Sequence, residues 1–212
     1  LSLHDALPIL YTEQLLKQLD IACCDDWQAV EEALDTHGLA YSYLGNWMPA
    51  LQRMIDLRNT LGLRSPIHSL ARVINPLNAH CGLQSIFHPG YQAVHREASR
   101  LLGDHAIVIK GEGGEIEVNP DVACHLYGTR NGEDWDEEWP ALSAQRHVKP
   151  ERLDPAVLNA FWRGEREDAY GQLAVVATMA VALRGLGMPR EQAFEQARQR
   201  WDARLRSNKP ID

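Results

Sequence analysis

Three arginines in one loop-rich stretch are the residues best suited to chemistry. Arg58, Arg64 and Arg72 lie within residues 58–76. A guanidinium presents a planar fork that matches phosphate or carboxylate, and it also stacks on bases. The stretch therefore predicts an anion-binding segment. Structural alternatives stay open: a helix-terminal role for Arg58 before Gly62, loop anchoring for Arg64, and a surface salt bridge for Arg72.

A second candidate is the glycine-rich turn at residues 111–114, which follows the apolar segment 105–110. Successive backbone N–H groups in such a turn can form a nest that holds an anion. The carboxylate of Glu112 would oppose an anion there, and a tight β-hairpin explains the same glycines. Both interpretations remain open from the turn alone.

The elements that must position these segments alternate between short apolar runs and amphipathic stretches. Strands are expected at residues 21–24, 39–44, 83–87, 105–110, 115–118 and 122–127. Helices are expected at residues 12–19, 26–36, 47–61, 91–102, 155–163, 169–186 and 189–206. Residues 131–140 are acidic and are predicted to form a solvated surface loop. The alternation predicts an α/β fold with a mostly parallel central sheet flanked by helices, ending in a helical segment.

Composition sets the class of protein. The chain has 212 residues, 45% of them hydrophobic and 24% charged, which is ordinary for a globular α/β domain. The formal net charge of −8 argues against a general polycation, although a local basic groove remains possible. No apolar run approaches the ~20 residues that cross a bilayer. Four cysteines without metal-ligand spacing favour reduced thiols and a cytoplasmic location.

The first nine residues differ in character from the rest. They contain no initiator Met, no basic leader and no cleavage site, and they look like a translated adapter or cloning junction. Residues 1–9 are therefore expected to be a non-native or junction peptide. One α/β domain is expected over residues 10–212, as the C-terminal fragment of a longer protein.

The stretch from residue 58 to residue 76 resembles the substrate-binding segment of anthranilate phosphoribosyltransferase-like proteins, glycosyltransferase family 3. That family runs Arg-x-x-Leu-Gly-x-Arg-Thr and then Asn-x-Leu-Gly-Pro-Leu-x-Asn-Pro. The matching residues here are Arg58, Leu61, Gly62, Arg64, Leu70, Asn75 and Pro76, with Ser65 standing for the Thr. The resemblance covers nearly everything after Leu10. It implies the nucleoside phosphorylase/phosphoribosyltransferase type of catalytic domain.

The resemblance implies a substrate site formed by Arg58, Arg64, His68 and Arg72. Its substrates in the family are phosphoribosyl diphosphate and a nitrogen acceptor. Two positions depart from the family. His68 stands for an Asn, and Ala71-Arg72 stands for a Gly-Pro whose Pro packs on the aromatic acceptor. A guanidinium in place of that flat apolar contact favours a phosphate, a carboxylate or a base.

A third departure concerns the metal. The family ends its glycine-rich turn with an Asp-Glu pair that holds magnesium, and here the pair reads Ile116-Glu117. Magnesium needs hard oxygen ligands, and Ile116 supplies none. The resemblance leaves Glu117 as the surviving metal ligand, unless Glu115 or Glu112 compensates through a shifted turn. Magnesium is therefore expected as a cofactor only if the transferase activity survives.

Two functions follow from the resemblance and stay open. One is pentosyl transfer from phosphoribosyl diphosphate, impaired or lost because of Ile116-Glu117. The alternative is nucleic-acid binding in the old substrate cleft, because the family has a DNA-binding, phosphoribosyltransferase-like branch that carries Ala and a basic residue in place of Gly-Pro. The family's diphosphate loop would lie upstream, and so would the N-terminal helices that imply a homodimer of the full-length protein.

Overall fold

The computed structural model describes residues 12–63, 65–111, 115–148 and 154–207, so Arg64 and residues 1–9 lie outside the described part. The chain divides into two compact units. The first comprises residues 1–68 and 149–167, and the second comprises residues 69–148 and 168–212. The single domain expected over residues 10–212 stays a prediction.

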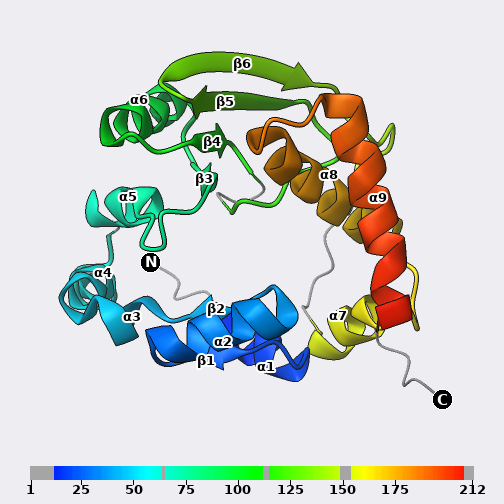
Figure 1. The fold of residues 1–212 in the computed structure, drawn as a ribbon, viewed down its shortest axis with the longest axis horizontal. Helices are drawn as coiled ribbons and strands as arrows, with labels where there is room; N and C mark the ends of the chain where they lie inside the picture. Colours follow the sequence, from blue (N-terminus) through cyan, green and yellow to red (C-terminus); the bar gives the residue numbers. More distant parts are fainter. Residues whose placement is uncertain (1–11, 64, 112–114, 149–153, 208–212) are drawn as a thin grey trace, which may run out of the picture. The chain divides into compact units, whose positions relative to one another are not determined.

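The first unit is built around a short parallel pair of strands. β1 (Cys23–Cys24) pairs with β2 (Tyr41–Ser42), and α2 (Trp27–His37) connects them. The helix begins where the Asp26 carboxylate accepts a hydrogen bond from the Ala29 N–H at 2.9 Å. The remaining helices of this unit are α1 (Thr12–Gln18), α3 (Leu44–Trp47), α4 (Pro49–Leu61) and α7 (Pro155–Trp162). Figure 1 shows these elements in order along the chain.

The single helix expected over residues 47–61 is wrong, because the chain forms α3 and α4 with a break at Met48. Proline has no backbone N–H and disfavours helical geometry in the residue before it. Met48 accordingly has φ −131° and ψ 62°, and Pro49 starts the second helix at its first turn. The end of α4 is as expected, since Gly62 adopts φ 69° and closes the helix.

The second unit contains a four-stranded sheet in the order β3-β4-β5-β6. β3 (Gly82–Ser85) and β4 (Ala106–Ile109) run parallel, whereas β5 (Cys124–Arg130) pairs antiparallel with β4 and with β6 (Glu133–Trp139). The α/β class with a helical C-terminal segment is confirmed. The mostly parallel pairing is wrong for this sheet, which is mixed.

Most of the acidic segment 131–140 forms the strand β6 (Glu133–Trp139), so the surface loop expected there is wrong. Asn131 and Gly132 have φ 53° and φ 80° and form a two-residue turn between Arg130 and Glu133. Positive φ at both central positions is the geometry of the tight hairpin turn that Asn-Gly favours. The strand expected at residues 115–118 is also absent, because these described residues form bends and irregular backbone.

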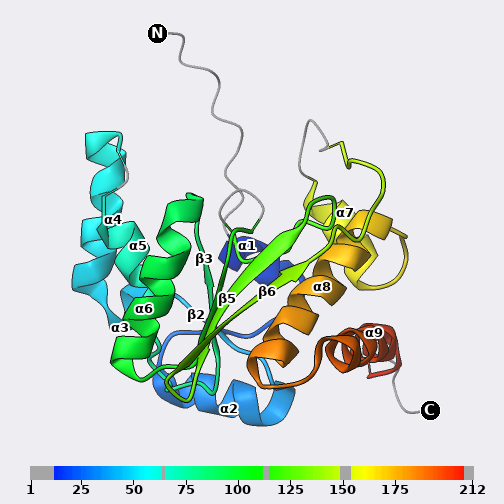
Figure 2. The same cartoon turned by 90° about the horizontal axis from the view of Figure 1, so that it is seen from above.

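Helices cover both faces of this sheet. Figure 2 shows α6 (Gln92–Leu102) on one side and α8 (Ala169–Gly185) on the other, with α9 (Arg190–Ser207) beside α8. β4 lies between two strands and two helical layers, so its residues Ile107, Val108 and Ile109 are fully buried. Short turns complete the unit: η1 (Ala71–Val73), η2 (Pro89–Tyr91) and the end of α5 (Ile67–Leu70).

No helix in the described residues is long and apolar enough to cross a membrane. The cytoplasmic location stays a prediction.

Candidate functional site

Arg58 lies in the last turn of α4. Its backbone carbonyl accepts the Gly62 N–H at 2.8 Å, which ends the helix. The side chain is exposed, and within the described part of the chain its guanidinium has no hydrogen-bond or ion-pair partner. Arg58 therefore takes part in ending the helix through its backbone carbonyl, which is the structural alternative to ligand binding. The anion-binding role of its side chain stays a prediction.

His68 lies in α5 and belongs, like Arg58, to the first unit. The Ser65 N–H lies 3.2 Å from its Nδ1 and can donate to it. The other ring nitrogen, Nε2, is buried and has no hydrogen-bond partner among the residues that the structure describes. Buried polar atoms are nearly always paired in native proteins, so an unpaired ring nitrogen is a position that a ligand can satisfy.

Arg72 belongs to the second unit and caps the end of a strand. It lies in η1, and its Nη1 donates to the Ser85 carbonyl at 2.5 Å and to the Ser85 Oγ at 3.2 Å. Ser85 is the last residue of β3, and α/β sheets bind ligands beyond the carboxyl ends of their strands. Arg72 is therefore placed at the sheet edge where a ligand site is expected. Part of its hydrogen-bonding capacity is used by the protein itself.

A buried polar network lies beside Arg72, and sequence reasoning missed it. Gln84 on β3 donates from Nε2 to the Ser99 Oγ at 2.8 Å, and its Oε1 lies 3.1 Å from the His95 Nδ1. All three residues are less than a tenth exposed. A signal existed in the helix, because Gln92, His95 and Ser99 follow the spacing of one helical face. That face carries hydrogen bonds into the sheet.

The His95 imidazole predicts a pH dependence of stability. Burial lowers the pKa of His95, and the nearby Arg72 guanidinium lowers it further. The unfolded chain then binds a proton at a pH where the folded chain does not, so acid favours unfolding. We expect the free energy of unfolding to be constant above the ordinary histidine pKa of about 6.5 and to fall as the pH drops below it. Urea unfolding between pH 5 and pH 8 measures this.

The matched variants for that measurement are His95→Gln and His88→Gln. His95→Gln is expected to flatten the decline between pH 6.5 and pH 5, whatever it costs in stability at neutral pH. His88 is exposed, and His88→Gln should leave the decline unchanged. An identical decline in the His95→Gln variant would refute the assignment.

Glu117 is exposed on the loop that follows β4 and Gly111. Gly111 lies close to this segment, because a Cβ on Gly111 would come within 2.7 Å of the Glu117 carbonyl oxygen. Residues 112–114 lie outside the described part. The described residues hold no group of three His, Cys, Asp or Glu side chains arranged for a metal ion. Ile116 brings no oxygen beside Glu117, and magnesium as a cofactor stays an expectation.

The described candidates divide between the units: Arg58 and His68 lie in the first, and Arg72 and Glu117 in the second. Each unit thus holds part of the predicted site. Within the second unit, Ser85 contacts Arg72, and Gln84 next to it in β3 contacts His95.

Sequence comparison finds anthranilate phosphoribosyltransferases among the relatives of this chain. No family model matches the chain. Anthranilate phosphoribosyltransferase from Paracidovorax citrulli is 25% identical over 185 residues, which are 83% of this chain and 54% of the relative. The enzyme of the same name from Ralstonia pickettii is 31% identical over 106 residues, 50% of this chain and 31% of the relative. The chain spans about half or less of the length of these curated relatives.

Solved structures agree at the level of the fold. Anthranilate phosphoribosyltransferase from Thermus thermophilus superposes with a TM-score of 0.65 at 22% identity, covering 92% of this chain and 64% of that one. The Saccharomyces cerevisiae protein in complex with PRPP and Mg gives 0.70 at 11% identity, covering 92% and 58%. Sequence matches and fold together confirm that the chain resembles anthranilate phosphoribosyltransferases, as residues 58–76 predict.

Proposed function

We propose that the protein is a glycosyltransferase family 3, phosphoribosyltransferase-like protein whose magnesium-dependent pentosyl transfer is disabled at Ile116-Glu117. The observation that carries the proposal is the loop after β4. Of the pair that holds magnesium in the family, this loop keeps one carboxylate, Glu117, and has Ile116 in place of the other, while the neighbouring Glu115 is also exposed. The relatives support the family, and the P. citrulli match extends over 83% of the chain.

The chemistry explains why one substitution matters. Displacing diphosphate from an anomeric carbon leaves a highly charged group, and its charge must be balanced in the transition state. An alkyl side chain at position 116 supplies neither charge nor a hydrogen bond. With Ile116 beside it, Glu117 supplies one carboxylate where the family has two, which leaves fewer protein oxygens to hold magnesium together with the substrate oxygens. Binding of the diphosphate group is therefore expected to be weak and insensitive to magnesium.

The acceptor side is altered as well. Arg72 lies where the family places a proline against an aromatic acceptor, and its guanidinium donates to the Ser85 carbonyl. That contact holds a positive charge at the carboxyl end of β3. An acceptor bound there would meet a planar cation, which selects for carboxylate or phosphate groups. The first unit also carries two candidate ligand-binding groups. One is the exposed guanidinium of Arg58, and the other is the buried Nε2 of His68, which has no partner among the described residues.

The test restores the missing carboxylate. In titration calorimetry with phosphoribosyl diphosphate, the full-length protein should show no magnesium-dependent binding. The Ile116→Asp variant should bind at least about tenfold more tightly with magnesium than without, the effect of one charge-assisted contact. Ile116→Asn is the matched control, because asparagine has the shape of aspartate without its charge. Its affinity for phosphoribosyl diphosphate should be the same with and without magnesium.

Magnesium-dependent binding by the unaltered protein, as strong as in Ile116→Asp, would overturn the proposal. Failure of Ile116→Asp to respond would show that the metal site is deficient at more than this position, and it would also contradict the proposal as stated.

Nucleic-acid binding is the second candidate, and the exposed guanidinium of Arg58 favours it. Phosphate contacts release counterions, so affinity for single-stranded DNA should fall steeply as salt rises. Arg58→Gln should weaken binding for all sequences and reduce the salt slope by about one phosphate contact. Gel shifts at two salt concentrations test this, and absence of binding at low salt rejects it.

A further inference from the structure

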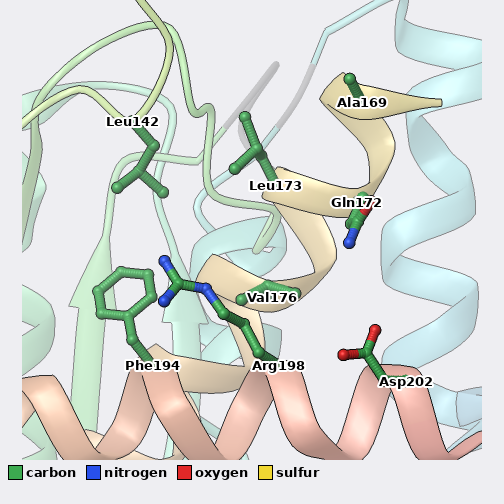
Figure 3. Close-up of a pocket in the computed structure, with 8 residues that line it drawn as sticks. All are labelled: Leu142, Ala169, Gln172, Leu173, Val176, Phe194, Arg198 and Asp202. Atoms are coloured by element: carbon green, nitrogen blue, oxygen red, sulfur yellow. The ribbon is translucent and has the colours of Figure 1, made fainter.

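A groove in the second unit is lined by residues none of which belongs to the candidate site. It has a volume of about 430 Å³ and is formed by α8, α9 and the loop after β6. Figure 3 shows its lining side chains. Small-molecule sites in proteins typically occupy ~300–1,000 Å³ and combine apolar walls with a few polar groups. The size of this groove therefore suits a small ligand.

The walls of the groove are apolar and firmly supported. Leu173 and Val176 line it from α8, and Phe194 lines it from α9. The Phe194 ring packs against the buried Trp139 ring with 4.8 Å between centroids. Leu142 closes the groove from the loop, where its N–H donates to the Pro120 carbonyl at 2.8 Å. These contacts hold the walls in place without a ligand.

Two opposite charges stand at the rim. Arg198 and Asp202 line the groove from successive turns of α9, and both are exposed. Among the described residues neither side chain makes a hydrogen bond, and no ion pair joins the two although they are four residues apart on one helix; the charge of Asp202 also acts on the nearby Arg204. A basic residue preceding an acidic one is the less favourable order for such a pair. In Figure 3 the guanidinium extends toward Phe194, and the carboxylate lies one turn away.

We propose that this groove binds a zwitterionic α-amino acid with an apolar side chain. The ligand carboxylate pairs with Arg198, its ammonium group pairs with Asp202, and its side chain lies against Leu173, Val176 and Phe194. A simple carboxylic acid would leave Asp202 unpaired beside its own negative charge. A simple amine would leave Arg198 unpaired beside the positive charge of its ammonium group. A ligand with both charges on an apolar body complements both charges of the rim and its apolar walls.

The experiment compares three probes that share one phenyl group. L-phenylalanine, 3-phenylpropanoate and 2-phenylethylamine are titrated into the full chain by calorimetry or by following amide shifts of α9. L-phenylalanine should bind saturably and at least about tenfold more tightly than either singly charged probe, the effect of one additional charged hydrogen bond. Equal affinity of 3-phenylpropanoate, or no saturable binding of L-phenylalanine, overturns the proposal.

Charge-neutral variants locate the contacts. Arg198→Gln and Asp202→Asn should each weaken L-phenylalanine binding about tenfold. Both side chains are exposed, so folding should be retained, and the thermal midpoint checks it. Arg200→Gln lies on α9 outside the groove lining and should leave affinity unchanged. Loss of affinity in Arg200→Gln equal to that in Arg198→Gln would mean a nonspecific charge effect and would overturn the site. The outcome is independent of phosphoribosyl diphosphate binding.

Discussion

Replacing Trp139 with alanine is expected to lower the free energy of unfolding by about 3–5 kcal/mol, the usual loss for a fully buried Trp. Trp139 is 1% exposed at the end of β6. Its ring packs on Phe194, and its Nε1 donates to the Glu137 Oε1 at 2.9 Å. Removing it leaves a cavity between the sheet and α9. Because the free energy of unfolding of a domain is only ~5–15 kcal/mol, this single substitution removes a large fraction of the stability.

Urea unfolding of Trp139→Ala against the unaltered protein measures the effect. Trp139→Phe retains an aromatic partner for Phe194 and should lose less. Val148→Ala is the surface control, since Val148 is 86% exposed and such changes usually stay within ~0.5 kcal/mol. A Trp139→Ala midpoint indistinguishable from that of Val148→Ala would show that Trp139 does not hold the sheet to α9.

Sequence reasoning succeeded where the signal is local. The Asp26 cap, the apolar face of α2 and the closing Gly38 all lie within thirteen residues of one another, and the helix forms between them as expected. The same holds for α7 and α8, which begin at the Asp154 and Asp168 carboxylates. Caps and helical periodicity act through neighbours in the chain, so one sequence is enough to recognise them.

The β6 strand was missed because its charges are neutralised by distant residues. Asp134 and Asp136 pair with Arg96 on α6, and Glu137 pairs with Arg184 on α8. Those partners are about forty residues away or more, so the acidic run resembles a loop until the fold is known. As the last strand of the sheet order, β6 is also an edge, and charged side chains discourage pairing with another chain there.

The candidate site likewise has some features that the sequence predicts and others that depend on tertiary packing. The chemistry of Arg72 follows from its side chain, and its position at the end of β3 agrees with a ligand-binding edge. Its contact with the Ser85 carbonyl depends on how η1 packs against β3, which residue types alone do not specify. The link from Gln84 to His95 likewise joins a strand to a helix. Tertiary packing decides both.

Replacing Gly128 with alanine is expected to destabilise the second unit by about 1–3 kcal/mol through overpacking. Gly128 on β5 lies directly opposite Trp135 on β6. A Cβ at Gly128 would lie closer than 3.0 Å to the Trp135 ring, a separation that real Cβ atoms essentially never show. The ring is held in place, because the Arg184 guanidinium lies 4.4 Å from its centroid and is itself bonded to Glu137 at 2.7 Å.

A double-mutant cycle separates this clash from any other effect of the added methyl group. Trp135→Ala removes the ring, so adding Gly128→Ala to it should cost far less than in the unaltered protein. Gly90→Ala is the matched control, because a Cβ there meets nothing within 4 Å. If Gly128→Ala costs the same with and without Trp135, the strain arises in the β5 backbone. If the destabilisation caused by Gly128→Ala disappears when Trp135 is absent, the cross-strand contact is the reason for a glycine in the centre of β5.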